Sequence, residues 1–355
     1  IRKPYNLYRY YFLSEKQTNE FDLNWNLNPM DSIRKLYHYK PRSFAEGLHY
    51  TFLFSTILFV FIILPVSFFV KFLIFAFFSF LFTVPMLSQF FFSALPILTW
   101  VFFYFSASKI PTSWRPPISV KYLPSMETIF YGDNLSDILA TSTNMFLDLL
   151  AWFPYGIIHF SVPFILAAFI FLFAPPTALR SYATAFGYMN LLGVIVQSTL
   201  PAAPPWYKVL YGLEPADYSM TGSAGGLGRI DKLFGFDMYS SNFANSPVIF
   251  GAFPSLHSGA ATMEALFLSY LFPRFKPLWW GYVFWLWWCT MYLTHHYFID
   301  LIAGSCLSLI CFATVKYTTL PIRDRNKFCR FSYTKLEYVN LISLDPSPNY
   351  HPLND

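Results

Sequence analysis

Long apolar runs separated by short polar stretches set the pattern of this chain. Each run is about 17–20 residues long and carries little or no charge, enough for a helix to cross a hydrocarbon core of about 30 Å. The strict alternation of apolar and polar residues that a membrane β-barrel requires is absent. The runs fall at about 48–65, 66–84, 89–106, 155–173, 181–200, 256–272, 278–294 and 299–317. The pattern therefore predicts an all-α, polytopic membrane helical bundle with about eight hydrophobic segments. Pro65 and Lys71 interrupt the first block, where one segment could be a half-span.

Positively charged residues indicate how the bundle is oriented. They cluster at 34–42, 274–276 and 316–330, and Arg180 lies in the turn after the fourth segment. Because basic residues favour cytosolic loops, these positions predict eight spans with both termini in the cytosol. The opposite face, lumenal or exterior, then receives 107–154, 201–255 and the turn at 295–298.

Composition narrows the range of functions. Of the 355 residues, 55% are hydrophobic, 22% are aromatic and only 12% are charged, about half the charged fraction usual in soluble proteins. The net charge of +5 is small and scattered, so no nucleic-acid partner is expected. No internal repeat is visible, which disfavours an inverted-repeat transporter.

Cysteine usage predicts no disulfide framework, since three of the four cysteines fall within predicted spans and Cys329 lies in the polar tail. Cys329 could be palmitoylated, although an inert thiol is the simpler interpretation. Asn134 begins an Asn-Leu-Ser glycosylation sequon in the predicted lumenal loop. The polar segment after residue 320 is expected to be a loosely ordered cytosolic tail.

The stretch MYLTHHYFIDLIAG, at 291–304, places three titratable residues in an otherwise apolar sequence. His296 and Asp300 are four residues apart, so on a helix Asp300 can reach back to one imidazole nitrogen. That contact would fix the tautomer and leave the other nitrogen basic, while His295 would point elsewhere. A satisfied polar pair at a membrane interface explains these two residues, taken alone, equally well.

A second stretch, GAFPSLHSG at 251–259, favours the functional interpretation. By the predicted topology, His257 begins the next span on the same membrane face as His296. Both histidines would lie at helix N-termini, whose free N–H groups suit a phosphate. Two imidazoles, one of them paired with a carboxylate, beside an anion site suit covalent phosphoryl chemistry.

Metal binding is the competing interpretation of these histidines. The i,i+4 spacing also suits metal ligands, but the chain has only seven histidines and no HExxH helix. His38, His49 and His351 are predicted to be cytosolic or close to the cytosol. A zinc site is therefore the weaker hypothesis, and no metal or other cofactor is expected.

These motifs resemble a known family. PSLH (254–257) followed by HYFID (296–300) looks like the second and third signatures of the type 2 phosphatidic-acid phosphatase superfamily, and HHYFID narrows the likeness to its sphingolipid synthase branch. The chain is similar to fungal inositol phosphorylceramide synthases at STLPAAPPWYKVLYG (198–212), FYGDNLSDILATSTN (130–144) and FGAFPSLHSGAATMEAL (250–266). The likeness extends from about residue 40 to residue 330.

The resemblance implies a reaction and a site. Phosphatidylinositol would be the donor and ceramide the acceptor, and the products would be inositol phosphorylceramide and diacylglycerol. His296 would attack phosphorus, with Asp300 stabilising its imidazolium. His257 would protonate the departing diacylglycerol oxygen and then take the proton of the ceramide hydroxyl.

The resemblance also implies an organisation and partners. Residues 48–320 would form the membrane catalytic domain, with a six-helix phosphatase-like core, between a cytosolic segment at 1–47 and the tail at 321–355. A Golgi membrane location, a small membrane regulatory subunit and inhibition by aureobasidin A are further implications of the family.

The chain departs from the superfamily pattern at two places. KIPTSWRP (109–116) is one residue too short between Lys and Arg-Pro for the first signature and lies too far upstream, and the third signature has Cys289 and Thr290 where Ser-Arg is usual. No motif therefore identifies the residues that bind phosphate and inositol. Residue type and location suggest Ser255 beside His257, Glu264 about two turns deeper, Asp148 and His159 near the fourth span, and Trp206, Tyr207, Lys208, Arg229 and Lys232 in the loop at 201–255. Solvated charges and interfacial aromatics explain the loop residues at least as well.

Two other classes of function remain open from the sequence. A lumenal lipid phosphatase could use the same three residues and deliver the phosphoryl group to water. A non-enzymatic lipid carrier or scaffold is disfavoured, because it has no need of an oriented histidine–aspartate pair. Only the acceptor pocket separates the phosphatase from the transferase, and the family-like loops favour the transferase.

Overall fold

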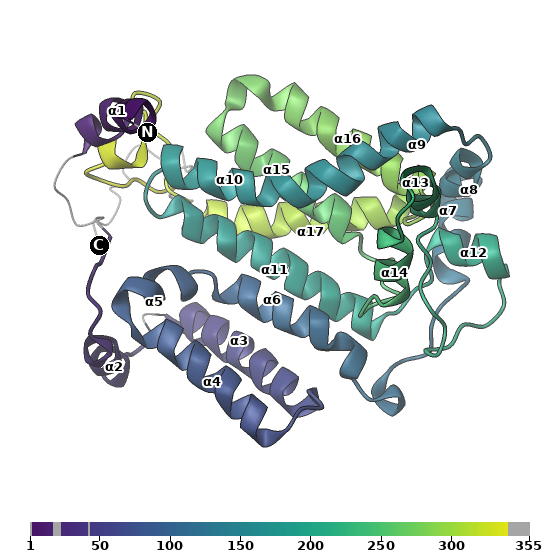
Figure 1. Ribbon diagram of the computed structural model, residues 1–355, viewed down its shortest axis with the longest axis horizontal. Coiled ribbons are helices and arrows are strands. Elements are labelled where there is room, and N and C mark those ends of the chain that lie inside the picture. Colours follow the sequence, from purple (N-terminus) through teal and green to yellow (C-terminus); the bar gives the residue numbers. More distant parts are fainter. Residues whose placement is uncertain (1, 17–22, 42, 340–355) are drawn as a thin grey trace, which may run out of the picture.

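Helices build almost all of the regular structure. The computed structural model describes residues 2–16, 23–41 and 43–339, and among these no strand forms beyond single bridges such as the one between Ser119 and Ala202. Long helices lie side by side along the molecule, and most of the short helices gather at one end (Figure 1).

Each of the eight predicted hydrophobic segments is helical over most of its length. The helices are α3 (Phe44–Ile63), α4 (Phe68–Thr83), α6 (Leu95–Ser106), α10 (His159–Phe173), α11 (Ala178–Thr199), α15 (Leu256–Leu271), α16 (Lys276–Tyr292) and α17 (Phe298–Lys316). Among the described residues, α3, the stretch Met145–Phe173 and α17 are each long and apolar enough to cross a membrane alone. The prediction of an all-α polytopic membrane bundle is confirmed.

The second and third segments differ from the prediction at their boundary. α4 is followed directly by α5 (Pro85–Phe91), and the two helices are bent by 103°. Pro85 explains the bend, since a proline can begin a helix but cannot continue the hydrogen bonds of the preceding one. Lys71 lies inside α4, where its Nζ donates to the carbonyl of Phe61 at 2.5 Å. It therefore satisfies one of the free carbonyls at the end of α3.

The fourth segment begins about three turns earlier than the predicted residue 155. α9 (Met145–Trp152) continues through a π-helical turn at Phe153–Ile158 into α10. The Asn144 side chain accepts from the Leu147 amide at 3.0 Å and caps the start of α9. A π-helical turn inside a longer helix often marks a functional site.

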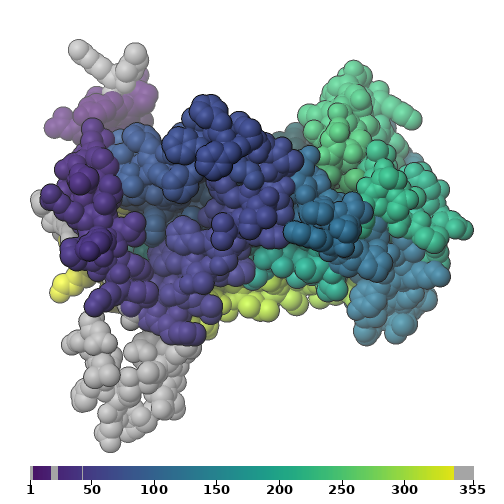
Figure 2. Space-filling model, turned by 90° about the horizontal axis from the view of Figure 1, so that it is seen from below, coloured from purple at the N-terminus to yellow at the C-terminus, as the bar shows by residue number. Residues whose placement is uncertain are grey.

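Five short helices from the middle of the chain lie together at one end of the molecule, here called the loop end. They are α7 (Tyr122–Tyr131), α8 (Leu135–Ala140), α12 (Pro205–Tyr211), α13 (Leu227–Phe234) and α14 (Met238–Ala244). The opposite, terminal end holds α1 (Arg2–Tyr11) and residues 320–339. The Phe12 and Phe328 ring centroids are 5.6 Å apart there, and Ser332 donates to Glu15 at 2.8 Å. Figure 2 shows the N-terminal residues and the loop end at opposite sides of the molecule.

The segment after residue 320 is more ordered than predicted. Cys329, Arg330 and Tyr333 are buried, and the Arg330 guanidinium lies 4.2 Å from the ring centroid of Phe171 on α10. The expectation of a loose tail is wrong for residues 321–339, because aromatic and cationic side chains dispersed among polar residues pack onto the bundle. The rest of the predicted tail, 340–355 with His351, lies outside the described residues. Burial of Cys329 also disfavours its palmitoylation in the folded protein.

Candidate active site

Small and hydroxyl-bearing residues bring α15 and α17 close together beside the histidines. A Cβ at Gly304 would overlap the carbonyl oxygen of Ser255 and lie 3.2 Å from the amide of Gly259. Ser258 donates to the carbonyl of Leu301 at 2.6 Å, and the Ser255 amide donates to the carbonyl of Asp300 at 3.0 Å. Buried hydroxyls linking two membrane helices in this way replace the hydrophobic attraction that lipid cannot supply. This contact between Ser255, Ser258 and Gly259 at the start of α15 and Asp300, Leu301 and Gly304 of α17, here called the seam, fixes the start of α15 against the start of α17.

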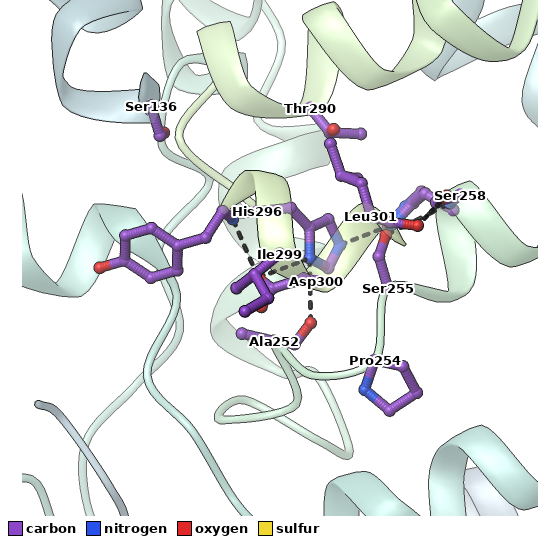
Figure 3. A network of polar contacts seen from close by, with 12 residues as sticks. Ser136, Ala252, Pro254, Ser255, Ser258, Thr290, His296, Ile299, Asp300 and Leu301 are labelled. Atoms are coloured by element: carbon purple, nitrogen blue, oxygen red, sulfur yellow. Dashed lines mark hydrogen bonds and ion pairs between the residues drawn. The ribbon is translucent and has the colours of Figure 1, made fainter. Parts of the chain in front are cut away.

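His296 lies just before α17, in the turn predicted at 295–298, and not on the helix assumed from its four-residue spacing to Asp300. Tyr297 is the N-cap residue, and its amide donates to Oδ2 of Asp300 at 2.9 Å. His296 Nδ1 is 3.1 Å from the carbonyl oxygen of Ala252 and 3.6 Å from Oδ2 of Asp300 (Figure 3). The expected histidine–aspartate contact is therefore present, but the backbone carbonyl is the nearer partner.

The two histidines meet directly. His257, in the first turn of α15, places its Nδ1 3.1 Å from Nε2 of His296. Because a carbonyl can only accept, the Ala252 contact assigns the proton of His296 to Nδ1 and leaves a lone pair on Nε2. His257 then donates from Nδ1 to that lone pair. The structure thus brings His257, His296 and Asp300 together, with a basic nitrogen of His296 facing His257.

Glu127, on α7, fills a position that the sequence did not suggest. Its buried carboxylate accepts hydrogen bonds from the amides of Phe298, Ile299 at 3.3 Å and Leu135 at 3.1 Å. Burial raises the pKa of the Glu127 carboxyl, the three amides oppose that shift, and the charge of Asp300 raises it further. The expectation that the N-terminus of α17 offers free N–H groups to phosphate is therefore wrong, because Glu127 already occupies them.

A signal for Glu127 did exist in the sequence. It is an acidic residue within the apolar stretch 122–131, where a solvated charge is unusual. Its partners at 298–299 are more than 170 positions away, so no local pattern could identify them.

Aromatic and histidine rings surround His257. The Tyr155 ring stacks on it at 4.6 Å between centroids, and the His159 ring lies at 4.8 Å. Tyr155 also stacks on His295 at 5.4 Å, so His295 lies near the site and not away from it as predicted. Within the described ranges, no group of three or more His, Cys, Asp or Glu side chains has a geometry suited to a metal ion.

Two of the basic candidates, Arg229 and Lys208, each form an ion pair with a carboxylate. Arg229 makes a bidentate contact with Asp148, with Nη2 2.7 Å from Oδ1 and Nε 3.0 Å from both oxygens. The Tyr292 hydroxyl donates to the same Oδ1 at 2.8 Å. Lys208 pairs with Asp137 at 2.6 Å near the surface of the loop end. These contacts give each charge a structural partner, and phosphate binding by Lys208 or Arg229 would have to compete with it.

The remaining candidates divide into packed residues and unpartnered ones. Trp206 and Tyr207 are buried against Phe250 in the core of the loop end, which disfavours the interfacial position considered for them. Ser255 caps α15 by accepting from the Ser258 amide at 3.2 Å. By contrast, both carboxylate oxygens of Glu264 and Nδ1 of His159 are buried with no hydrogen-bond partner among the described residues. Lys232 is exposed on α13.

The glycosylation sequon is buried. Asn134 is 3% exposed and donates to Thr128 at 3.1 Å, and Ser136 donates to the carbonyl of Met291 at 2.8 Å. A glycan on Asn134 would break these contacts, so the fold disfavours use of the sequon.

Comparison with known proteins identifies the family. A model described as PAP2 superfamily matches residues 122–314. An inositol phosphorylceramide synthase of Candida albicans is 59% identical over 357 residues, covering 100% of this chain and 76% of the relative. The inositol phosphorylceramide synthase catalytic subunit AUR1 of Saccharomyces cerevisiae is 59% identical, covering 96% of this chain and 85% of the relative. The corresponding aur1 subunit of Schizosaccharomyces pombe is 49% identical over 89% of this chain and 75% of the relative. The resemblance drawn from the motifs is confirmed, and the chain belongs to the inositol phosphorylceramide synthase family of phosphotransferase enzymes within the PAP2 superfamily.

Proposed function

We propose that this chain transfers phosphoinositol from phosphatidylinositol to ceramide, through a phosphohistidine on His296. The observation that carries the proposal is the 3.1 Å contact between Nε2 of His296 and Nδ1 of His257. It pairs a nucleophilic nitrogen, oriented by its other side, with a second imidazole that can move a proton.

The first half of the reaction forms a bond between nitrogen and phosphorus. The Nε2 lone pair of His296 attacks the phosphorus of phosphatidylinositol, and the bond from phosphorus to the diacylglycerol oxygen breaks. The negative charge of the donor phosphodiester favours the doubly protonated form of His257. That imidazolium gives one proton to the departing oxygen, which leaves as the diacylglycerol hydroxyl, and His257 is left neutral. Positive charge develops on the His296 imidazole, and the buried carboxylate of Asp300, 3.6 Å from Nδ1, stabilises it.

The second half reverses these roles. His257, now a neutral imidazole, takes the proton of the ceramide primary hydroxyl and becomes doubly protonated again, while the ceramide oxygen attacks phosphorus. The bond between nitrogen and phosphorus breaks, which restores neutral His296 and releases inositol phosphorylceramide. One phosphodiester replaces another, so the reaction requires no nucleotide.

Binding of the donor must open the contact between the two histidines. Phosphorus has to approach Nε2 of His296 to about 3–3.5 Å before attack. The His257 nitrogen lies in that direction at 3.1 Å. The imidazole of His257 must therefore turn aside when the donor enters, and it can then face the leaving oxygen.

Incubation of the purified protein with phosphatidylinositol labelled in inositol, with and without ceramide, tests this function. We expect labelled inositol phosphorylceramide only when ceramide is present, with retention of configuration at a chiral thiophosphate donor. Release of labelled inositol phosphate into water, independent of ceramide, would identify a lipid phosphatase instead. Inversion of configuration would mean that ceramide attacks directly and that His296 acts as a base.

We extend the proposal to location and partners. Basic residues at the terminal end support a cytosolic position for both termini, with the loop end and the histidines on the lumenal face of a Golgi membrane. Residues 48–320 would then be the catalytic domain. Two relatives are named catalytic subunits, and we propose that this chain also works with a small membrane regulatory subunit. Inhibition by aureobasidin A is a further expectation from the family.

A further inference from the structure

Two polar atoms next to His257 are buried without a partner. Among the described residues, neither Nε2 of His295 nor the hydroxyl of Tyr155 has a hydrogen-bond partner. The two side chains are 5% and 1% exposed, and the Tyr155 ring stacks on both His257 and His295. Leaving such atoms unpaired costs about 1–3 kcal/mol each. The cost is avoided if a bound molecule supplies the missing hydrogen bonds.

The tautomer of His295 determines what its free nitrogen can bind. The backbone of Ala224 is the hydrogen-bond partner of the ring, and Nε2 is unpaired, so the contact involves Nδ1. A backbone carbonyl accepts only a proton, and Nε2 is therefore left as an acceptor. Burial, with a smaller contribution from His296, lowers the pKa of His295 to about 3. The ring is neutral near pH 7, and its Nε2 requires a donor such as a hydroxyl group.

The position of His295 indicates which part of a lipid would supply that hydroxyl. Its ring stacks on Phe243 of α14 at 4.5 Å between centroids. Gly225, with φ +51°, is also a neighbour of the ring, since an added Cβ there would be in ordinary contact with Nε2 at 3.6 Å. Both residues belong to the loop end, whereas acyl chains must lie along the membrane helices. The free nitrogen therefore lies on the headgroup side of the reacting histidines.

We propose that Nε2 of His295 accepts a hydrogen bond from a ring hydroxyl of the donor lipid's headgroup, and that the Tyr155 hydroxyl donates to the same headgroup. The proposal rests on the proposed function and adds the residues that recognise a polyhydroxylated headgroup beside phosphorus. A polyol can donate to one atom and accept from the other, which a choline or ethanolamine headgroup cannot do.

Three substitutions at His295 separate recognition from packing. His295→Phe keeps a ring between Tyr155 and Phe243, and His295→Asn keeps a donor near the position of Nδ1, but both lose the acceptor at Nε2. His295→Gln retains a polar atom near Nε2. We expect kcat/KM for phosphatidylinositol to fall about 10- to 100-fold in the Phe and Asn variants, and less in the Gln variant. His49→Gln, which changes a histidine hydrogen-bonded to Tyr188 at 2.9 Å outside the site, is the matched control.

Donor analogues that each lack one inositol hydroxyl complete the test. In the wild-type protein, one analogue should have a kcat/KM about 10- to 100-fold lower than that of phosphatidylinositol. In His295→Phe, whose kcat/KM for phosphatidylinositol is already reduced, the same analogue should react almost as well as phosphatidylinositol itself. Tyr155→Phe should weaken use of phosphatidylinositol in the same way. The inference would be overturned if removal of each inositol hydroxyl lowered kcat/KM by the same factor in every variant as in the wild type. It would also be overturned if the Phe and Asn variants were as active as the wild type. Absence of transfer by the wild type would instead reject the proposed function itself.

Discussion

Two groups, a backbone carbonyl and a carboxylate, lie close to the same ring nitrogen of His296 and orient the ring. The carbonyl oxygen of Ala252 lies 3.1 Å from Nδ1, while the Asp300 carboxylate lies 3.6 Å away and also accepts from the Tyr297 amide. The carbonyl therefore fixes the tautomer, and the carboxylate contributes mainly negative charge. In many hydrolase triads the carboxylate performs both tasks.

This division of tasks predicts the behaviour of Asp300→Asn. The Ala252 carbonyl still holds the proton on Nδ1, so the variant keeps the tautomer but loses the charge that stabilises imidazolium. We expect the rate of transfer to fall about 10²-fold or more, with little change in the thermal unfolding of the purified protein. Asp237→Asn, an exposed position on the loop end, is the control. A variant that keeps the full transfer rate would show that the Asp300 charge is not used.

At the scale of elements, the sequence predicted the helices that carry the site but not what fixes them. Hydrophobicity and motif placed the span that begins near His257 and the span that begins in the HHYFID stretch. They could not predict the Glu127 contact, since it joins an acid on α7 to amides of α17 that are remote in sequence. The prediction of an anion site at the N-terminus of α17 was wrong for this reason. Hydrophobic periodicity identifies a helix, but a buried carboxylate at its N-terminus is a tertiary contact.

Substitution of Glu127 should loosen the start of α17. Glu127→Ala leaves the amides of Phe298, Ile299 and Leu135 buried without an acceptor, and we expect a loss of about 2 kcal/mol or more in stability together with lower kcat. Glu127→Gln retains one carbonyl oxygen and should lie between the wild type and Ala. Thermal unfolding and transfer rates in detergent measure both effects. Glu214→Gln, at an exposed residue, should match the wild type; an equally stable Glu127→Ala protein would contradict this role.

The seam between α15 and α17 gives a second prediction at this scale. A methyl group at Gly304 would overlap the Ser255 carbonyl, so Gly304→Ala must push the two helices apart and displace His257 from His296. We expect a loss of transfer of about 10²-fold, since small misplacements of reacting groups are costly. Gly281→Ala is a matched control on α16, because a Cβ there meets no atom within 4 Å. Equal activity of the two variants would show that the seam tolerates the separation.

At the scale of the whole molecule, two opposite ends carry different kinds of structure. The loop end holds the turn with His295 and His296 and the helices α7, α8 and α12 to α14. The terminal end holds α1 packed against residues 320–339 (Figure 1). Charge alone predicted that both terminal segments share one side, and their mutual contacts support it. Charge could not predict that residues 321–339 pack tightly, because burial of Cys329 and Tyr333 depends on neighbours supplied by other helices.

The arrangement of the ends predicts how the protein sits in a membrane. Glu214 and Asn326 are exposed at the loop end and the terminal end, respectively. In sealed vesicles of known orientation, a membrane-impermeant thiol reagent should label Glu214→Cys only from the lumenal side and Asn326→Cys only from the cytosolic side. The parent chain provides the background, because Cys289, Cys311 and Cys329 are buried and Cys306 lies within α17. Labelling of both positions from one side would reject the proposed orientation. Labelling of each from the side opposite to that predicted would place the histidines in the cytosol, and the donor and acceptor lipids would then have to be drawn from the cytosolic leaflet.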